Sequence, residues 1–462
     1  MLIPLLAPQG EGYSKTLNAQ RTVNLYPVTD PGGKAPVSLY GTPGTVLFAT
    51  CGTGPIRGML QHRGVGYVVS GNKLYSVTSG GVATEQGTLT TSTGAVSMEC
   101  NGLQIVVGDG SGYVYDIALS TFAEITDGDF PGSATWAYLD GYGIFNQDDA
   151  ETFYITSLLD FTGVDALDFA SAESLPDTLV RVFADHGELW LFGSESIEIW
   201  QNTGAAAFPF ERLGNTRVEK GLAAKFSVAK VDNTVFWLGS DGVVYRADGY
   251  LPTRISTEQV ETSISGMDDV SDAEGFTYDQ DGHKFYVLTF PGEEQTWVYD
   301  VATQMWHERT SADLGYWRAR GHMQMGRKQI VGDSESGKLF ELSTASYTDD
   351  GAEMIATHIL PAAQLGRSRN FHYRFELEVE SGVGLVSGLG SDPQIILDWS
   401  DDGGHTWSNE LSRTAGAIGE YGRRAIWNRL GVAVSRNYRI KISDPVKRVI
   451  IAAHVEGMPG AV

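Results

Sequence analysis

A β-hairpin pattern recurs seven times along this chain and limits what the chain can fold into. Each copy has a run of alternating apolar and polar residues, a polar or Gly-containing turn, and a second alternating run, as two antiparallel strands require. The copies begin at Gly66, Leu103, Tyr142, Glu188, Thr234, Lys284 and Lys328. Their starts lie 37 to 50 residues apart, about 44 on average. Four short strands fit in that interval, which is the ~40–50-residue repeat of propeller blades.

We therefore predict an all-β fold whose main body is a β-propeller of six or seven blades. Helical periodicity is confined to Thr257–Ile264, which is enough for two turns. The 56 glycines follow no three-residue repeat and indicate many tight turns rather than collagen. Two stacked β-sandwiches remain the alternative architecture, although they would not need the regular interval.

Three regions of the chain differ in pattern and charge. Residues 1–45 are rich in Pro, Gly and Asn and show little alternation, so we expect an extended N-terminal arm. Residues 46–350 hold the propeller repeats, and residues 351–462 have longer alternating strands typical of a C-terminal β-sandwich. Residues 1–350 carry 21 basic and 45 acidic residues, whereas residues 351–462 carry 12 of each. The acidic excess therefore ends at the predicted domain boundary.

The net charge of −24 argues against a protein that grips nucleic acid or an anionic membrane. No run of ~18 apolar residues is present, so we expect no membrane binding. The N-terminus lacks a basic segment and contains Pro4, unlike a secretory signal. The two cysteines, Cys51 and Cys100, are too few for a disulfide framework or a zinc cage. We expect synthesis in a cytoplasm.

One motif has the spacing S-x-D-x-G-x-T-W of the Asp box, which is found in sialidases and other carbohydrate-active propellers. Its residues are Ser400, Asp402, Gly404, Thr406 and Trp407. We expect a structural turn, in which Ser400 and Asp402 bond backbone N–H groups, Gly404 takes a positive φ and Trp407 anchors the next strand. Sugar contact is the alternative. A sialidase would carry several boxes, and this chain carries one.

No catalytic residue, metal site or cofactor site is predicted. The nine histidines form neither an HExxH motif nor an i, i+4 pair. Gly332–Lys338 matches the first seven P-loop positions, but Leu339 stands where Mg²⁺ binding needs Ser or Thr. Asp333 and Glu335 would also repel phosphates. Among the abundant carboxylates, a glycosidase pair or a Ca²⁺ site in an acidic loop such as Asp268-Asp269 stays open.

The basic clusters lie in the C-terminal region. They comprise Arg423, Arg424, Arg436 and Arg448. Nearby acidic residues balance them, so we expect contacts with neighbouring protein subunits rather than with nucleic acid.

Many short segments together resemble the packaged-DNA stabilisation proteins, also called tail accessory or tail hub (nozzle) proteins, of short-tailed bacteriophages. The segments are Asn24-Leu25-Tyr26-Pro27, Tyr40–Gly44, Ser171–Asp177, Phe192–Glu198, Asn202–Gly204, Glu219–Gly221, Ile255–Thr257 and Ile426–Gly431. None is a catalytic motif, so the resemblance depends on the pattern over most of the chain.

This resemblance implies a non-enzymatic virion protein of the phage tail, made and assembled in the host bacterial cytoplasm. Such proteins form a ring, usually of six copies, below the portal and its head-to-tail adaptor proteins. The ring closes the DNA channel and holds a tail needle, fibres or tailspikes. An acidic channel wall suits DNA that slides past without sequence-specific binding, because each neutralised phosphate would add affinity. A carbohydrate-active or receptor-binding tail propeller is the alternative function.

Overall fold

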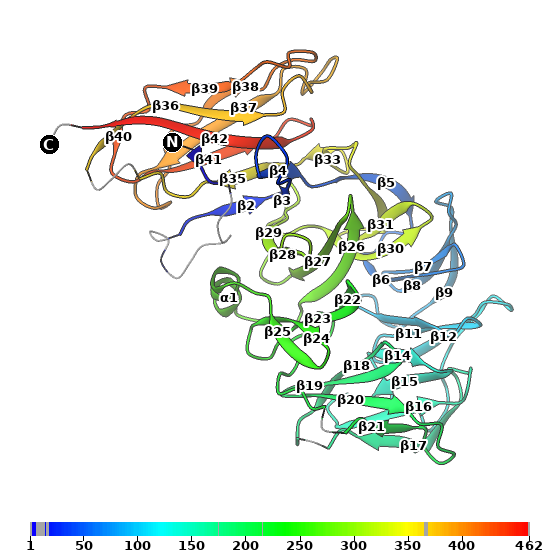
Figure 1. Cartoon of the computed structure of the whole chain (residues 1–462). Helices are drawn as coiled ribbons and strands as arrows, with labels where there is room; N and C mark the ends of the chain where they lie inside the picture. Colours follow the sequence, from blue (N-terminus) through cyan, green and yellow to red (C-terminus); the bar gives the residue numbers. More distant parts are fainter. Residues whose placement is uncertain are drawn as a thin grey trace.

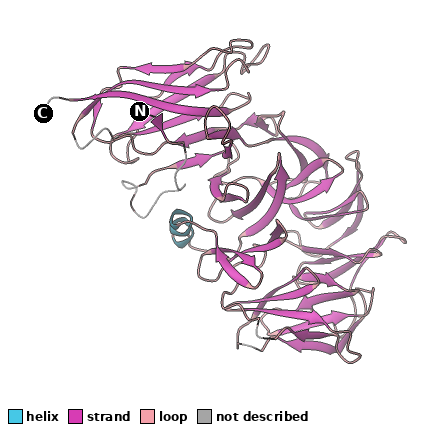
Figure 2. Cartoon of the chain, in the orientation of Figure 1, coloured by secondary structure: helices cyan, strands magenta, loops and turns pink. Residues whose placement is uncertain are grey.

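Strands make up nearly all of the regular structure in this computed structural model, as the alternation predicts (Figure 2). The structure describes residues 2–5, 14, 18–173, 175–214, 216–364 and 368–460. The one helix in these ranges, α1 (Glu258–Ser265), begins after Thr257, within the segment of helical periodicity. Its buried residues Val260 and Ile264 lie on the side that packs against the neighbouring strands. No helix in these ranges is long and apolar enough to span a membrane.

Seven four-stranded antiparallel units form the propeller, which confirms the predicted architecture. The first blade contains β6 (Ile56–His62), β7 (Val65–Ser70), β8 (Lys73–Val77) and β9 (Ala83–Thr88). The second contains β10 (Ser97–Cys100), β11 (Gln104–Gly108), β12 (Gly112–Asp116) and β13 (Thr121–Glu124). The third contains β14 (Trp136–Leu139), β15 (Tyr142–Asn146), β16 (Thr152–Thr156) and β17 (Val164–Ser171). The fourth contains β18 (Leu179–Asp185), β19 (Glu188–Gly193), β20 (Ile197–Asn202) and β21 (Phe210–Arg212). The fifth contains β22 (Ala229–Val231), β23 (Thr234–Leu238), β24 (Val244–Asp248) and β25 (Leu251–Arg254). The sixth contains β26 (Glu274–Gln280), β27 (His283–Phe290), β28 (Gln295–Asp300) and β29 (Met305–Glu308). The seventh contains β30 (Ala319–Met325), β31 (Lys328–Asp333), β32 (Lys338–Ser343) and β5 (Gly44–Thr50).

Each repeat seen in the sequence is the middle hairpin of one blade. β7–β8 is the first of these hairpins and β31–β32 is the seventh. Apolar side chains occupy both faces of these hairpins because each face of a blade packs against a neighbouring blade. Seven clusters of buried hydrophobic residues each lie between two neighbouring blades. One of these clusters lies between the seventh blade and the first. The propeller is therefore a closed ring of seven blades.

The ring is closed by a strand from the start of the chain. β5 pairs antiparallel with β32 and supplies the fourth strand of the seventh blade. The inner strand β30 of that blade lies beside β6 of the first blade. Closure therefore depends on contacts between residues almost 300 positions apart, such as Thr45 and Leu342. The expected border between arm and propeller, at residue 45, falls inside this strand.

A β-sandwich of two sheets follows the propeller and packs beside it (Figure 1). One sheet contains β1 (Leu2–Ile3), β3 (Leu25–Thr29), β4 (Val37–Gly41), β36 (Asn370–Val379), β39 (Ala425–Asn428), β40 (Val432–Ala433) and β42 (Val449–Pro459). The other contains β2 (Arg21–Val23), β35 (Ala356–Ile359), β37 (Gln394–Ser400), β38 (Leu411–Thr414) and β41 (Asn437–Ile442). The short β33 (Thr348–Asp349) and β34 (Ala352–Glu353) connect the two domains. Phe375, Trp427 and Tyr438 lie fully buried between the sheets.

The N-terminal segment is part of this sandwich rather than a separate arm. β1 and β4 both pair with β42, close to the other end of the chain. β2 pairs with β35 of the sandwich and, in parallel, with β29 of the sixth blade. One continuous sheet of nine strands therefore runs from β26 in the propeller to β38 in the sandwich. The sequence did not indicate these partners because the segment shows little alternation.

Candidate interaction surfaces

The Asp-box residues form a hydrogen-bonded turn directly after β37. The Ser400 hydroxyl donates to Asp402 at 2.7 Å and accepts from the Gly404 N–H at 2.7 Å. The Asp402 carboxylate accepts from the Thr406 N–H at 2.9 Å and from the Thr406 hydroxyl at 2.6 Å. Gly404 has φ +93°, which favours glycine. Both oxygens of Asp402 are thus used by its own turn.

Trp407 is half-buried. The Arg439 guanidinium lies over its ring, 3.9 Å from the centroid. Arg439 is itself held by two hydrogen bonds to the buried carboxylate of Asp398. Trp407 therefore fixes the turn to the sheet partly through a cation–π contact.

Arg436 is buried inside the sandwich, so its predicted role as an interface donor is wrong. Only 2% of its side chain is exposed, and it forms two hydrogen bonds to Asp401, at 2.6 and 2.7 Å. A third bond reaches the backbone oxygen of Leu430, and the guanidinium lies over the ring of Trp399 at 5.1 Å. Arg436 directly precedes β41, and its hydrogen bonds to Asp401 and Leu430 hold the guanidinium within the sandwich.

Arg448 is likewise buried and is also a wrong prediction for an interface. Its guanidinium donates to the backbone oxygens of Tyr347, Ser443 and Asp444. Burial lowers the pKa of its guanidinium to about 10, against the opposing effect of Asp444 and other acids. Because Tyr347 ends the propeller and Ser443 belongs to the sandwich, Arg448 links the two domains.

Arg423 and Arg424 lie on the surface, where the prediction placed them. Arg424 is an ion-pair partner of Glu376, at 3.0 Å, and Arg423 lies 3.8 Å from Glu420. Both arginine side chains are more than half exposed, so each pair contributes about 0–1 kcal/mol to stability. The two arginines can therefore change partners at little cost. Their role at a subunit interface stays a prediction.

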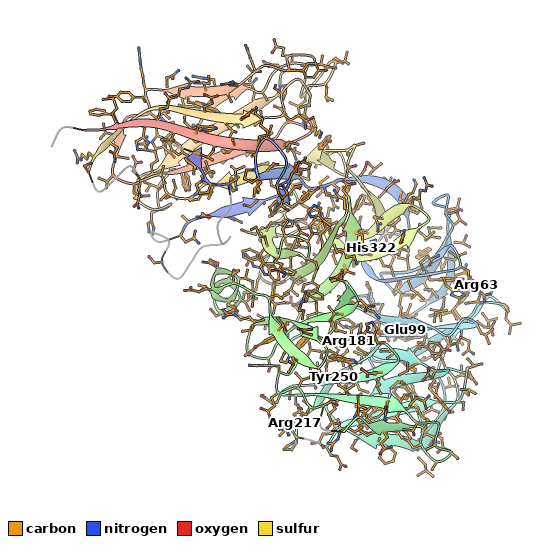
Figure 3. The ribbon with its side chains drawn as sticks, viewed as in Figure 1. Arg63, Glu99, Arg181, Arg217, Tyr250 and His322 are labelled. Atoms are coloured by element: carbon orange, nitrogen blue, oxygen red, sulfur yellow. The ribbon has the colours of Figure 1, made fainter. Side chains whose placement is uncertain are left out.

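The inner strands bring a charged pair to the middle of the propeller that the sequence did not reveal. Glu99 on β10 and Arg181 on β18 come from the second and fourth blades and lie near one another (Figure 3). Arg181 donates to the backbone oxygen of Lys225 at 2.8 Å. Burial raises the pKa of Glu99 to about 7, and the Arg181 charge opposes that rise. Only the ring closure places these residues together, since 82 positions separate them.

The acidic loops hold their carboxylates in different ways. Asp349 is buried and accepts hydrogen bonds from the hydroxyls of Thr45 and Ser311. Asp268 and Asp269 are exposed, and their backbone N–H groups donate to Glu293. Within the described ranges, no three His, Cys, Asp or Glu side chains are grouped to hold a metal ion.

Solved structures with a similar chain path have low sequence identity. The extracellular domain of BT4673 from B. thetaiotaomicron is 10% identical, with a TM-score of 0.45, over 69% of this chain and 46% of that one. PorZ of Porphyromonas gingivalis is 12% identical, with a TM-score of 0.39, over 81% and 46%. The WD40 β-propeller domain of Doa1 is 12% identical, with a TM-score of 0.42, over 65% and 96%. This chain thus spans about half the length of the first two.

Two protein-family models match the chain in succession, and a search of curated proteins found no match. The first model is described as the β-propeller of bacteriophage P22 Gp10 and matches residues 1–347. The second is described as the β-sandwich of the same protein and matches residues 356–458. The propeller match includes β5, the N-terminal strand that closes the ring. With both domains matched in order over nearly the whole length, the chain belongs to the phage stabilisation protein family of bacteriophage P22 Gp10.

Proposed function

We propose that this chain is a structural tail protein of a short-tailed phage, which assembles as a ring below the portal and keeps the packaged DNA in the head. The observation that carries the proposal is the ordered match of both domains to bacteriophage P22 Gp10. In this role the protein binds head-to-tail adaptor proteins on one side and a needle, fibres or tailspikes on the other. A homo-hexamer is the expected ring.

The connection between the two domains suits a protein that transmits force between its partners. The nine-stranded sheet continues from propeller to sandwich where β2 pairs with β29, at Val23 and Glu308. Where it crosses, Arg21 of β2 forms two hydrogen bonds to Glu308 of β29, at 2.7 and 2.8 Å. Arg448 and Asn24 add further bonds between the domains. These bonds would let the two domains transmit force between partners bound at either end.

The negative charge of the chain also supports a protein that forms the wall of a DNA channel. The net charge of −24 resides before residue 351, so six copies would carry about −144. Counterions screen such a field beyond ~8–10 Å at physiological salt. The acidic propeller therefore repels DNA only at close range, as a channel wall does. Arg423 and Arg424 are the candidate donors for carboxylates of neighbouring subunits or tail partners.

The test is a phage with a nonsense codon in the gene for this chain. Heads should package DNA but lose it during purification, measured as DNase-sensitive genome copies per capsid. Expression of the wild-type chain from a plasmid should restore retention. Expression of the Arg423→Glu/Arg424→Glu double variant should restore it poorly, although the variant remains folded by circular dichroism.

A cryo-electron map of the intact particle completes the test. Density for the propeller and sandwich should lie below the portal and should be absent from the mutant. Mutant heads that retain their genomes, or density for this chain at a fibre tip alone, would contradict the proposed function.

A further inference from the structure

An apolar row crosses three adjacent strands of the sandwich on its outer face. Phe371 of β36 stands opposite Val432 of β40 on one side and opposite Met458 of β42 on the other. Residues opposite each other in antiparallel strands point to the same face of a sheet. All three side chains are exposed, Phe371 by 43% and Met458 by 59%. Tyr373 continues the row, with its ring stacked 6.1 Å from that of Phe371.

Two exposed arginines flank this row. The Arg429 N–H donates to the Tyr373 backbone oxygen, and Arg369 accepts from the Gly460 N–H beside Phe371. Neither arginine has an ion-pair partner among the residues that the structure describes. We call the row and its arginines the β36 patch (Arg369, Phe371, Tyr373, Arg429, Val432 and Met458). Exposed aromatic, Met and Arg residues in one place are typical of protein interfaces.

A second unusual surface is a bulge in β17, the outer strand of the third blade. Tyr154 of β16 pairs with Phe169, but Thr156 pairs with Val164. Four residues, Asp165–Asp168, therefore stand opposite the single residue Ile155 and project from the edge of the blade. Leu167 in this bulge is 81% exposed. We call Asp165–Asp168 the β17 bulge.

The charge of the β17 bulge is opposite to that of the β36 patch. Asp165 and Asp168 lie on either side of Leu167, and Asp165 accepts a hydrogen bond from the Leu167 N–H. Neither carboxylate has an ion-pair partner in the described part of the chain. Phe169, also exposed, extends the apolar surface. Two unpaired acids around an exposed leucine thus match two unpaired arginines around an apolar row.

The two surfaces lie far apart on one molecule. In Figure 1, β40 and β42 are at the upper left end, and β17 is at the lower right end. One molecule therefore cannot join its own patch and bulge. Complementary surfaces at opposite ends of a subunit generate a head-to-tail contact, which closes into a ring when the rotation permits.

We propose that the β36 patch of one copy binds the β17 bulge of the next copy, with Leu167 on the Phe371–Tyr373 row and the two aspartates at Arg369 and Arg429. This inference rests on the proposed ring and names its contact surfaces. The charge complementarity favours a second copy over an anionic lipid surface, because the rest of the chain is strongly acidic.

A charge exchange tests the contact. The patch variant is Arg369→Asp/Arg429→Asp, and the bulge variant is Asp165→Lys/Asp168→Lys. Like charges then face each other, so each variant alone should self-associate at least 100-fold more weakly in sedimentation velocity of the full chain. The quadruple variant, and a 1:1 mixture of the two double variants, should recover assembly because every contact again joins opposite charges. Arg63→Asp/Arg327→Asp is the control, with the same charge change at two exposed arginines elsewhere. Arg63 is labelled in Figure 3.

Incorporation of each variant into particles of the nonsense phage gives a second readout. The expected order is normal incorporation for the control and the quadruple variant, and loss for each double variant. Normal incorporation and assembly of the double variants would overturn the inference and leave the proposed function standing. Loss that the quadruple variant does not repair would assign the surfaces to another protein or to lipid. Absence of even the wild-type chain from particles would instead contradict the proposed function.

Discussion

At the scale of single residues, two arginines of the sandwich should behave very differently when they are removed. Arg436→Ala removes a buried guanidinium that bonds Asp401 and Leu430. The backbone oxygen of Leu430 loses its partner, while Asp401 is 44% exposed and regains water. We expect a loss of about 2–3 kcal/mol in the free energy of unfolding. Arg424→Ala, at an exposed pair, should cost about 0–1 kcal/mol.

Urea denaturation of the two variants beside wild type measures both values. Equal midpoints for Arg436→Ala and Arg424→Ala would contradict the structural role of Arg436.

Asp402 gives the sandwich a defined pH dependence. Its hydrogen bonds from Thr406 and Ser400 hold the pKa of the carboxyl well below its usual range. A carboxyl with a depressed folded-state pKa stabilises the fold above its unfolded pKa, about 3.9, and this contribution is lost as the pH falls toward the folded-state pKa. Asp402→Asn should therefore lower the melting temperature at pH 7. The difference from wild type should shrink progressively below about pH 4.

Thermal melts from pH 2 to 8 check this expectation, with the exposed Asp313→Asn as a control for general charge effects. A difference that stays constant from pH 7 to pH 2 would show that the charge of Asp402 is unimportant.

The same preparations should be assayed for sialoside turnover, which we expect to be absent from wild type because both Asp402 oxygens serve the turn.

At the scale of elements, the junction of β2 and β3 depends on Asn24. Its side-chain amide donates to the backbone oxygens of Thr310 in the propeller and Ile355 beside the sandwich, and its oxygen accepts from the Thr310 N–H. Its φ of +56° is a conformation that Asn adopts more readily than Ala. Asn24→Ala should cost about 2–4 kcal/mol and let the domains unfold in separate steps.

Asn24→Gly separates the two causes, because it loses the hydrogen bonds but tolerates the positive φ. It should be about 1 kcal/mol more stable than Asn24→Ala. Differential scanning calorimetry should resolve two transitions in both variants. A single transition at the wild-type temperature would exclude this role for Asn24.

The inner strand β10 contributes a destabilising charge through Glu99. A carboxyl whose folded-state pKa is raised loses stability as the pH rises from its unfolded pKa, about 4.3, to its folded-state pKa of about 7. Glu99→Gln should remove this loss, so it should be more stable than wild type above pH 7 by about 1–3 kcal/mol. The gain should vanish below about pH 4. Urea titrations at pH 4, 6 and 8 measure it, with exposed Glu124→Gln as the control.

At the scale of the whole molecule, the acidic charge predicts how the protein meets DNA. The purified chain should bind duplex DNA no more tightly than ~10⁻⁴ M at physiological salt, because few phosphates can be neutralised. Fluorescence anisotropy with a labelled duplex measures this over a range of salt concentrations. Micromolar affinity that falls steeply with salt would show a basic surface that the net charge conceals, and would contradict a repulsive channel wall.

Much of the architecture could be predicted because its signals are local. The hairpin at Gly66 and the turn at Ser400 both depend on residues close in sequence, whose alternation or turn chemistry fixes their conformation. The burial of Arg436 and Arg448 could not be predicted in this way. Whether an arginine points outward or into the core depends on which strands cover it, and those strands lie elsewhere in the chain.

The repeating hairpins, the β-sandwich strands, the Asp-box turn and the uneven charge can all be recognised from residues close together in the sequence. The folded chain shows in addition that β5 closes the propeller and that β1 to β4 belong to the sandwich. Folding also brings Glu99 near Arg181 and places the β36 patch and the β17 bulge at different ends of the molecule. Local alternation specifies a strand and its buried face, whereas the strand's partner is selected by the packing of segments hundreds of residues apart.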